Sequence, residues 1–432
     1  MLRGGSALPL LVLLLGAWGV CANAGATTTS AGAFPIIHCR PFVVVWNMPT
    51  EQCQERHGVS IDLSTFDIIQ NRQQRFLGQN MTIFYRNKLG LYPYISQDGR
   101  EVNGGVPQQA TLEEHLRRAS GTIRSWLRPN FGGLAVIDWE DWRPLWVRNW
   151  DTKKKYQHVS MRLARQQHPQ LPVRELAQVA QEEFETGARA IMERTLQLGV
   201  GLRPSGLWGY YGFPDCYNYY KQQSSTSYTG HCHPSTAQRN DRLDWLWQNS
   251  TAIYPSIYLP HQLASREEAG LFVRYRVLEA MRVASTFRSA RGARPVLPYA
   301  RVAFAHTLQY LGQRELEQTL GESAALGAAG VVLWGEQRFA NSKRNCEVLR
   351  DYVDSVLGGY VRKLTSAASQ CSQSRCSGNG RCARQDRDSS ASLTLPSARS
   401  PGAPPDLDAL GSSFICVCYP GWTGQRCQNR LR

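Results

Sequence analysis

The stretch Leu134-Ala135-Val136-Ile137-Asp138-Trp139-Glu140 begins with apolar residues and ends with two acids. Its composition predicts a strand over Leu134–Glu140. Six further runs of β-branched or aromatic residues predict strands, at Pro41–Trp46, Met81–Tyr85, Leu207–Phe213, Ala252–Leu259, Val296–Phe304 and Gly330–Trp334. Stretches of helical periodicity separate these runs, and Glu175–Leu198 is the clearest example, with apolar residues three or four positions apart.

A repeat of strand and helix over about seven units indicates a parallel sheet covered by helices. We expect closure into a distorted TIM-like (β/α) barrel of about seven parallel strands rather than an open sheet, although the regular barrel has eight strands. This barrel is predicted over residues 25–365 of the 432-residue chain. A small disulfide-rich module is predicted at residues 366–432, with a flexible insertion rich in Ser, Pro, Ala and Asp at residues 385–413.

The N-terminus has the pattern of a secretory signal peptide. Arg3 precedes an apolar run at residues 7–20, and Ala22-Asn23-Ala24 has the small-x-small form of a signal-peptidase site. We therefore assign residues 1–24 to a signal peptide; a membrane anchor is the alternative, but the run is short for a spanning helix. The polar C-terminus shows no lipid-anchor tail. We expect a protein of the secretory pathway, lysosomal or extracellular, without a membrane anchor.

Cysteines are expected to form disulfides in this compartment. Removal of residues 1–24 leaves eleven of the 12 cysteines, an odd number, and Cys39 is the candidate for the unpaired thiol. Closure of the sheet would bring together Cys53, after the first predicted strand, and Cys346, after the last, while Cys216 and Cys232 would close a small loop. The remaining six cysteines lie in the C-terminal module. A zinc knuckle is the alternative there, but it requires paired C-x-x-C ligands, so no metal or other cofactor is expected.

The two acids at the end of the third predicted strand are the candidate chemistry. Alternation along a strand places Asp138 and Glu140 on one face, with α-carbons about 6.6 Å apart. Strand ends carry the chemistry in barrels of this kind, so both carboxyls are expected at the barrel mouth. Two buried carboxylates side by side favour a shared proton, which makes one of them an acid poised for catalysis. The alternative is a pair of solvated acids bound to Arg143.

Neighbouring acids also constrain the mechanism. A retaining glycosidase normally places its acid and its nucleophile on opposite sides of the scissile bond, whereas two acids in phase on one strand approach from the same side. The remaining route uses the N-acetyl oxygen of the substrate as nucleophile. Glu140 would protonate the leaving oxygen, and Asp138 would stabilise the acetamido group. This route requires an N-acetylhexosamine at the cleaved position.

The acidic run resembles the active-site signature of the hyaluronidases, glycoside hydrolase family 56, and specifically the non-anchored lysosomal or secreted type. The motifs that carry this resemblance are Asp138 to Pro144 with Asn149-Trp150, Met81 to Tyr85, Gly206 to Cys216, Tyr254 to Tyr258, and Gly321 to Ala325. Cys416 and Cys418, which form a C-x-C step, and the turn-rich residues 419–424 resemble the end of an EGF-like domain. That resemblance implies the pairs Cys371–Cys382, Cys376–Cys416 and Cys418–Cys427.

The family resemblance implies endo-hydrolysis of hyaluronan, with some action on chondroitin, at β-1,4 N-acetylhexosamine linkages. It implies that Glu140 is the proton donor, that Asp138 is its partner, and that Tyr258 binds the acetamido group. The substrate-binding residues that it implies are Tyr85, Arg143, Tyr211, Asp215 and Trp334. Each aromatic residue taken alone also fits a simpler role in filling the barrel. A second function fits the same resemblance, namely a hyaluronan-binding or cell-recognition protein with little catalysis.

Charge and the remaining motifs are consistent with a polyanionic substrate. The formal net charge is +15, and hyaluronan carries one carboxylate per disaccharide, so a basic groove would attract it. Lys153, Lys154 and Lys155 fit either such a groove or a solvated helix start. No H-E-x-x-H, G-x-S-x-G or P-loop motif is present, and we expect a monomer that binds glycosaminoglycans and not nucleic acid. Asn80 and Asn249 lie in glycosylation sequons.

Overall fold

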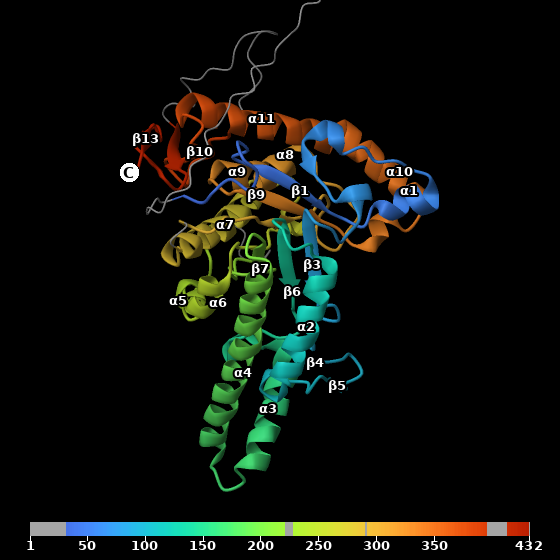
Figure 1. The fold of residues 1–432 in the computed structure, drawn as a ribbon, viewed down its shortest axis with the longest axis vertical. Coiled ribbons are helices and arrows are strands. Elements are labelled where there is room, and N and C mark those ends of the chain that lie inside the picture. The colour runs from blue at the N-terminus through green and yellow to red at the C-terminus, as the bar shows by residue number, and fades with distance from the viewer. Residues whose placement is uncertain (1–31, 221–227, 290–291, 395–412, 432) are drawn as a thin grey trace, which may run out of the picture.

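The computed structural model describes residues 32–220, 228–289, 292–394 and 413–431 (Figure 1). The predicted signal peptide therefore lies outside the described residues. Two parallel sheets form the centre of the molecule. One has the order β2-β1-β9-β8 and the other the order β3-β6-β7. Their strands are β1 Val43–Asn47, β2 Ile68–Ile69, β3 Met81–Tyr85, β6 Leu134–Asp138, β7 Leu207–Tyr210, β8 Tyr299–Ala300 and β9 Gly330–Trp334.

Residues 252–258 connect the two sheets on one side. Parallel bridges join Tyr211 to Tyr254, Ile253 to Val296, and Ser256 to Tyr299. The prediction of a continuous strand at Ala252–Leu259 is wrong, and the strand predicted at Val296–Phe304 shortens to β8. Pro255 and Pro298 interrupt these runs, and because proline has no backbone N–H, each one removes a ladder donor.

Asn71 connects the sheets on the other side. Among the described residues no ladder pairs β2 with β3. The Asn71 side-chain amide donates to the Met81 carbonyl at 2.8 Å and accepts from the backbone N–H groups of Asn80 and Met81 at 3.1 and 3.2 Å. A side chain thus supplies the hydrogen bonds that a backbone pair would make, and the result is a TIM-like barrel that is distorted.

Helices cover the outer faces of the sheets. The helices that follow β1 to β7 in the chain are α1 Glu51–His57, α2 Leu112–Trp126, α3 Lys154–Gln167, α4 Val173–Leu202, α5 Thr236–Asp241 and α6 Asp244–Asn249. The later helices are α7 Glu268–Thr286, α8 Gln313–Leu316, α9 Glu322–Ala325, α10 Lys343–Tyr352 and α11 Gly358–Arg375. The helix predicted at Glu175–Leu198 is confirmed within α4. Figure 1 shows α2, α3 and α4 extending away from the sheets, with the hairpin of β4 Tyr94–Ile95 and β5 Glu101–Val102 beside them. No helix among the described residues is long and apolar enough to span a membrane.

Five disulfides are described: Cys53–Cys346, Cys216–Cys232, Cys371–Cys382, Cys376–Cys416 and Cys418–Cys427. These are the pairs named from the sequence. The first links positions 293 residues apart, and loop-closure entropy makes such a cross-link worth about 5 kcal/mol. Cys39 is also disulfide-bonded, so the expectation of an unpaired thiol is wrong. That expectation came from the odd number of cysteines left when residues 1–24 are removed, and residues 1–24 lie outside the described residues.

The C-terminal module packs directly against the barrel. Strand β10 Gly380–Arg384 pairs antiparallel with β11 Phe414–Cys418, and β12 Trp422–Thr423 pairs with β13 Asn429–Arg430. Helix α11 passes through the predicted boundary at residues 365 and 366 without a break. All of β10 is buried, and Arg381 donates to the carbonyls of Phe34 and Pro41, at the start of the described chain, at 2.9 and 2.7 Å. These contacts tie the module to the barrel.

Part of the predicted flexible insertion is also packed. Leu393 is buried, and Thr394 donates to Glu317 at 2.7 Å. Arg274 donates to the Ser389 carbonyl at 2.8 Å and pairs with buried Glu322 at 2.7 Å. Residues 389–394 of the predicted insertion therefore contribute buried and hydrogen-bonded side chains and backbone to the fold. Residues 395–412 lie outside the described residues.

His115 on α2 is a buried histidine held in its neutral form. Its Nδ1 accepts from the Leu91 N–H at 2.8 Å, and its Nε2 lies 2.8 Å from the Thr195 hydroxyl, which itself donates to the Ile191 carbonyl. Nε2 therefore carries the proton. Burial lowers the pKa of His115 to about 4. Its ring packs edge-on against Trp139, the residue that separates Asp138 from Glu140 in the sequence.

We predict that His115 makes the fold sensitive to acid. An unfolded histidine takes up a proton near pH 6.5 and the folded one only near pH 4, so the unfolding free energy falls as pH falls through this window, by up to about 3 kcal/mol. His115→Gln should be less stable at pH 7 but should lose this part of the pH dependence. Denaturant titrations at pH 7, 5.5 and 4 measure the unfolding free energy of each variant. The control is His158→Gln, at an exposed histidine on α3. If the unfolding free energy changed equally with pH in wild type and in His115→Gln, the assignment of a buried neutral His115 would be contradicted.

Candidate active site

The barrel interior leads directly to the candidate site. Alternate strand residues form the interior core, among them Val43 and Val45 of β1, Met81 and Ile83 of β3, Leu134 and Val136 of β6, and Val332 of β9. The same alternation places Tyr85, Asp138 and Trp334, the last residues of β3, β6 and β9, above this core. These three residues line a cavity of about 540 Å³ together with Arg86, Asn87, Glu140, Asp141, Thr152, Lys153 and Lys155.

Volume alone does not identify the site. A cavity of about 1070 Å³ lies between α7 and residues 388–394. Glu322 in that cavity is already paired, since it accepts from Arg274 at 2.7 Å and from Arg384 at 2.6 Å. The smaller cavity at the strand ends is the one that holds the two acids. Among the described residues, no group of three or more His, Cys, Asp or Glu side chains is arranged to hold a metal ion.

The two acids differ in their surroundings. Strand β6 ends at Asp138, two residues earlier than predicted, because its partner β3 ends at Tyr85, which is paired with Asp138. Glu140 therefore lies beyond the sheet, with 52% of its side chain exposed. Trp139 between them is buried on the opposite side. The alternation thus continues past the strand and keeps both carboxyls on the cavity.

The surroundings of Asp138 favour the protonated form of its carboxyl. Burial raises the pKa of its carboxyl to about 8, the charge of Glu140 adds to this effect, and Arg143 opposes it. Glu140 instead faces solvent and lies 3.6 Å from the Arg143 guanidinium. Glu140 is therefore a solvated acid beside Arg143, whereas Asp138 is not. The alternative of two solvated acids describes only one of the pair. The pair has the arrangement expected of two carboxyls that share one proton.

Four aromatic side chains meet at one side of the acids. Trp334 donates from its indole nitrogen to the Tyr85 hydroxyl at 3.0 Å. Tyr258 stacks on Trp334 and lies against Tyr211, with ring centroids 5.8 Å apart in both pairs. Tyr211 belongs to the interior core, whereas Tyr85, Tyr258 and Trp334 are only partly buried. Barrel filling therefore describes Tyr211 best. Tyr85 and Trp334 line the cavity, whereas Tyr258, which stacks on Trp334, is not among the lining residues.

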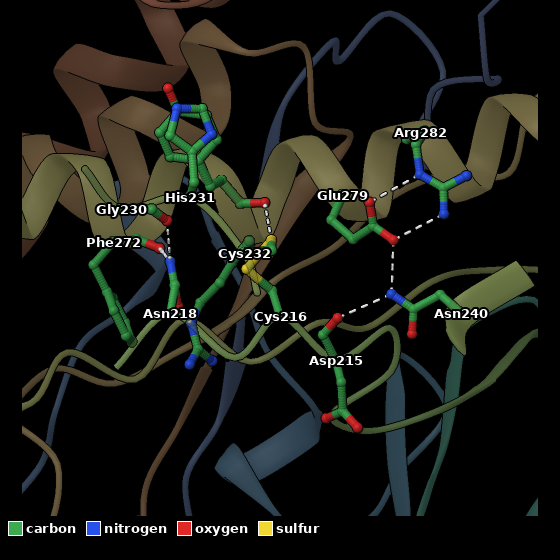
Figure 2. Close-up of a disulfide and its surroundings, with 12 residues drawn as sticks. Asp215, Cys216, Asn218, Gly230, His231, Cys232, Asn240, Phe272, Glu279 and Arg282 are labelled. Carbon is green, nitrogen blue, oxygen red and sulfur yellow. Dashed lines mark hydrogen bonds and ion pairs between the residues drawn. A yellow bond between two sulfur atoms is a disulfide. The ribbon is translucent and has the colours of Figure 1, made fainter. Parts of the chain in front are cut away.

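Asp215 lies apart from the cavity lining. Its backbone carbonyl accepts from Asn240 at 2.9 Å, and Asn240 also donates to Glu279, which is paired with Arg282 (Figure 2). The neighbouring Cys216–Cys232 disulfide fixes the same segment. Figure 2 shows the Asp215 carboxylate directed away from Asn240, and it lies 3.3 Å from the buried guanidinium of Arg148.

Arg86 and Asn47 were not singled out from the sequence, and of the two only Arg86 lines the cavity. Arg86 directly follows β3 and pairs with Asp141, so the rule that strand ends carry the site would have found it. Asn47 ends β1 in phase with the interior, and its buried Oδ1 has no hydrogen-bond partner among the described residues. Of the three lysines at 153–155, the first and third line the cavity, while Lys154 is exposed.

The two sequon asparagines use their side chains within the fold. Asn80 is exposed and donates to the Gln70 carbonyl at 2.7 Å. Asn249 donates to the Trp245 carbonyl at 2.7 Å and to Glu193 at 3.1 Å. Glycosylation replaces one of the two amide hydrogens, so it would have to release one of the two Asn249 bonds but not the Asn80 bond, and at both positions it stays a prediction.

Comparison with known proteins identifies the family. The sequence profile of the family described as hyaluronidase matches residues 31–431. The chain belongs to this family, glycoside hydrolase family 56. It is 45% identical to hyaluronidase-1 of Homo sapiens over 92% of this chain and 94% of the relative. It is 48% identical to hyaluronidase-3 of Sus scrofa over 90% of each.

A solved structure agrees with the fold. Bee venom hyaluronidase in complex with a hyaluronic acid tetramer is 32% identical, with a TM-score of 0.68 over 74% of this chain and 98% of that chain. The TIM-like architecture predicted from the sequence is thereby confirmed.

We predict that Asp138 destabilises the fold as pH rises. The folded protein keeps a proton on this carboxyl up to about pH 8, whereas the unfolded chain releases it near pH 4, so the unfolding free energy falls as pH rises between these values. Asp138→Asn is neutral at every pH. Its thermal midpoint should therefore rise by a few degrees relative to wild type between pH 4 and 8. Asp351→Asn, at an exposed acid on α10, is the control. A difference that does not change with pH would contradict the buried proton.

Proposed function

We propose that the protein is an endo-β-N-acetylhexosaminidase that hydrolyses hyaluronan, and also chondroitin, at β-1,4 N-acetylhexosamine linkages. The observation that carries the proposal is the pair of in-phase acids at the barrel mouth, one buried and protonated and the other exposed in the cavity. Membership of the hyaluronidase family and the hyaluronic acid tetramer bound by the bee venom relative support the substrate class.

The proposed reaction retains configuration and uses the substrate as nucleophile. Glu140 donates a proton to the glycosidic oxygen while the bond from that oxygen to the anomeric carbon breaks and the acetamido oxygen bonds to the same carbon. A cyclic cation results. Water then attacks the anomeric carbon, Glu140 takes its proton, and the acetamido group is restored. Two inversions at one carbon give net retention.

Asp138 supplies the complementary charge. In the free protein the shared proton lies on Asp138, because that carboxyl is buried. An acetamido N–H that donates to Asp138 would favour its ionised form and would leave the proton on Glu140, where the leaving oxygen needs it. The ionised Asp138 then faces the positive charge that develops on the acetamido group. One proton moving within the pair thus prepares both acids.

The surrounding side chains fit the roles implied by the family. Burial raises the pKa of the Tyr258 hydroxyl well above its ordinary value, so this group stays a donor for the acetamido oxygen. Tyr85 and Trp334 present partly exposed aromatic faces to sugar rings, with Tyr211 packed behind them. Arg143, beside Glu140, is placed to orient that carboxyl or to meet a glucuronate. Asp215, which the family resemblance implies as a substrate-binding residue, lies outside the cavity lining and pairs with buried Arg148, so we propose no direct contact between it and the substrate.

Location and assembly are inferred from the same features. We infer residence in the secretory pathway, in the lysosome or outside the cell, because eleven disulfide-bonded cysteines are typical of an oxidising compartment. We also propose that the protein acts as a monomer and without a cofactor.

We predict that Glu140→Gln removes most of the activity and keeps binding. The amide has nearly the shape of the acid but no proton to donate, and general acid catalysis is worth about 10²- to 10⁴-fold in rate. A reducing-end assay on hyaluronan between about pH 3.5 and 7 measures the loss, and binding to immobilised polymer is measured alongside. Unchanged turnover would reject Glu140 as donor. Binding by a wild type that produces no reducing ends would favour the alternative of a recognition protein.

A further inference from the structure

Glu140 is not held by the sheet. It lies two residues beyond the end of β6, so no ladder hydrogen bond fixes its backbone. A general acid must nevertheless stay within hydrogen-bond reach of the oxygen that it protonates, and displacement by about 1 Å can cost about 10²-fold in rate. Contacts outside the sheet must therefore hold the loop of residues 139–149, which we call the acid loop.

Side chains hold the acid loop along its length. Trp142 donates from its indole nitrogen to the Pro93 carbonyl at 2.8 Å. Asn149 accepts from the Arg143 N–H and donates to the Arg143 carbonyl, both at 2.8 Å. The backbone carbonyls of Glu140 and Asp141 both accept hydrogen bonds from the Lys153 ammonium, the second at 3.2 Å.

Lys153 reaches these carbonyls from a constrained position. It ends the 3₁₀ turn Asp151–Lys153, directly before α3, and this turn begins with Asp151 at a φ of 52°. The side chain is partly buried and lines the same cavity as the two acids. Burial and the charge of Arg143 lower the pKa of Lys153 to about 8, so the ammonium persists at neutral and acidic pH.

We propose that Lys153 is a positioning residue for the general acid. Its ammonium binds the main-chain carbonyls of Glu140 and Asp141 and thereby holds the Glu140 carboxyl over the cavity, in phase with Asp138. Lys153 acts on the backbone that carries the acid and needs no contact with the substrate. This inference rests on the proposed function of Glu140 as proton donor.

Lys155 provides a matched control within the same cavity. It carries the same charge and also lines the cavity, but its ammonium donates to the Ile95 carbonyl at 2.8 Å, in the β4–β5 hairpin. It makes no described hydrogen bond to the acid loop. Loss of Lys155 therefore removes a cation from the groove without releasing Glu140. Attraction of a polyanion is affected by both lysines, whereas positioning of the acid depends on Lys153 alone.

The test compares Lys153→Met with Lys155→Met in the full-length protein, on hyaluronan. Lys153→Met should lower kcat by about 10- to 100-fold, because the placement of the acid is lost, and should raise KM no more than Lys155→Met does, because each variant removes one cation from the groove. Lys155→Met should keep kcat and should raise KM most at low salt. Lys153→Arg, which keeps a cationic donor, should recover much of kcat. Thermal midpoints check that each variant is folded.

Two results would overturn the inference. One is a kcat for folded Lys153→Met within about twofold of wild type, and the other is an equal loss of kcat in Lys155→Met, which would make the effect one of charge. Should Lys153→Met fail to fold, Lys153→Gln is measured by the same criteria. Failure of the proposed function is distinguishable, since it appears as a wild type without turnover or as a Glu140→Gln variant that keeps turnover.

Discussion

The burial of one carboxyl at the end of an interior strand face is the constraint on which the site depends. Asp138 follows the column of apolar side chains that fills the barrel and is only partly exposed, so its charge is less well hydrated than that of a surface acid. With Glu140 two residues away on the same face, ionising both groups together is unfavourable, and the pair keeps a proton well into the neutral range. The barrel thus keeps on a pair of ordinary acids the proton that the proposed reaction requires.

The barrel that carries this pair is irregular, and its irregularities are compensated locally. Single bridges join the sheets on one side, and the Asn71 amide replaces backbone pairing on the other. Such closures contribute fewer ladder bonds than continuous strands. The Cys53–Cys346 disulfide joins segments near the carboxyl ends of β1 and β9, and the C-terminal module inserts Arg381 and Arg384 into the barrel side. The module therefore works as part of the barrel fold rather than as a separate attachment.

The sequence predicted the features that depend on neighbouring residues and missed those that depend on distant ones. Met81–Tyr85 and Gly330–Trp334 are confirmed to the residue, because a buried parallel strand needs only an apolar run, and the alternation of the two acids follows from strand geometry. The strand expected at Ala252–Leu259 failed because proline removes ladder donors that composition alone does not count. The end of β6 was misplaced because it depends on where β3 stops. The packing of residues 385–394 depends on Arg274 and Glu317, more than seventy positions away, which no local pattern reveals.

The same division between local and distant contacts explains why the two acids behave differently. The sheet fixes Asp138, and its burial follows from the strand pattern itself. Side chains outside the sheet fix Glu140, namely Asn149 of the acid loop and Lys153 through the loop backbone, and Arg143 of the same loop through the carboxyl. An acid held by the sheet can be buried deeply enough to keep a proton, and an acid held by a loop can be exposed enough to meet a polymer. A strand two residues longer would have held both acids in the same way, and the difference in burial that separates donor from partner would be reduced.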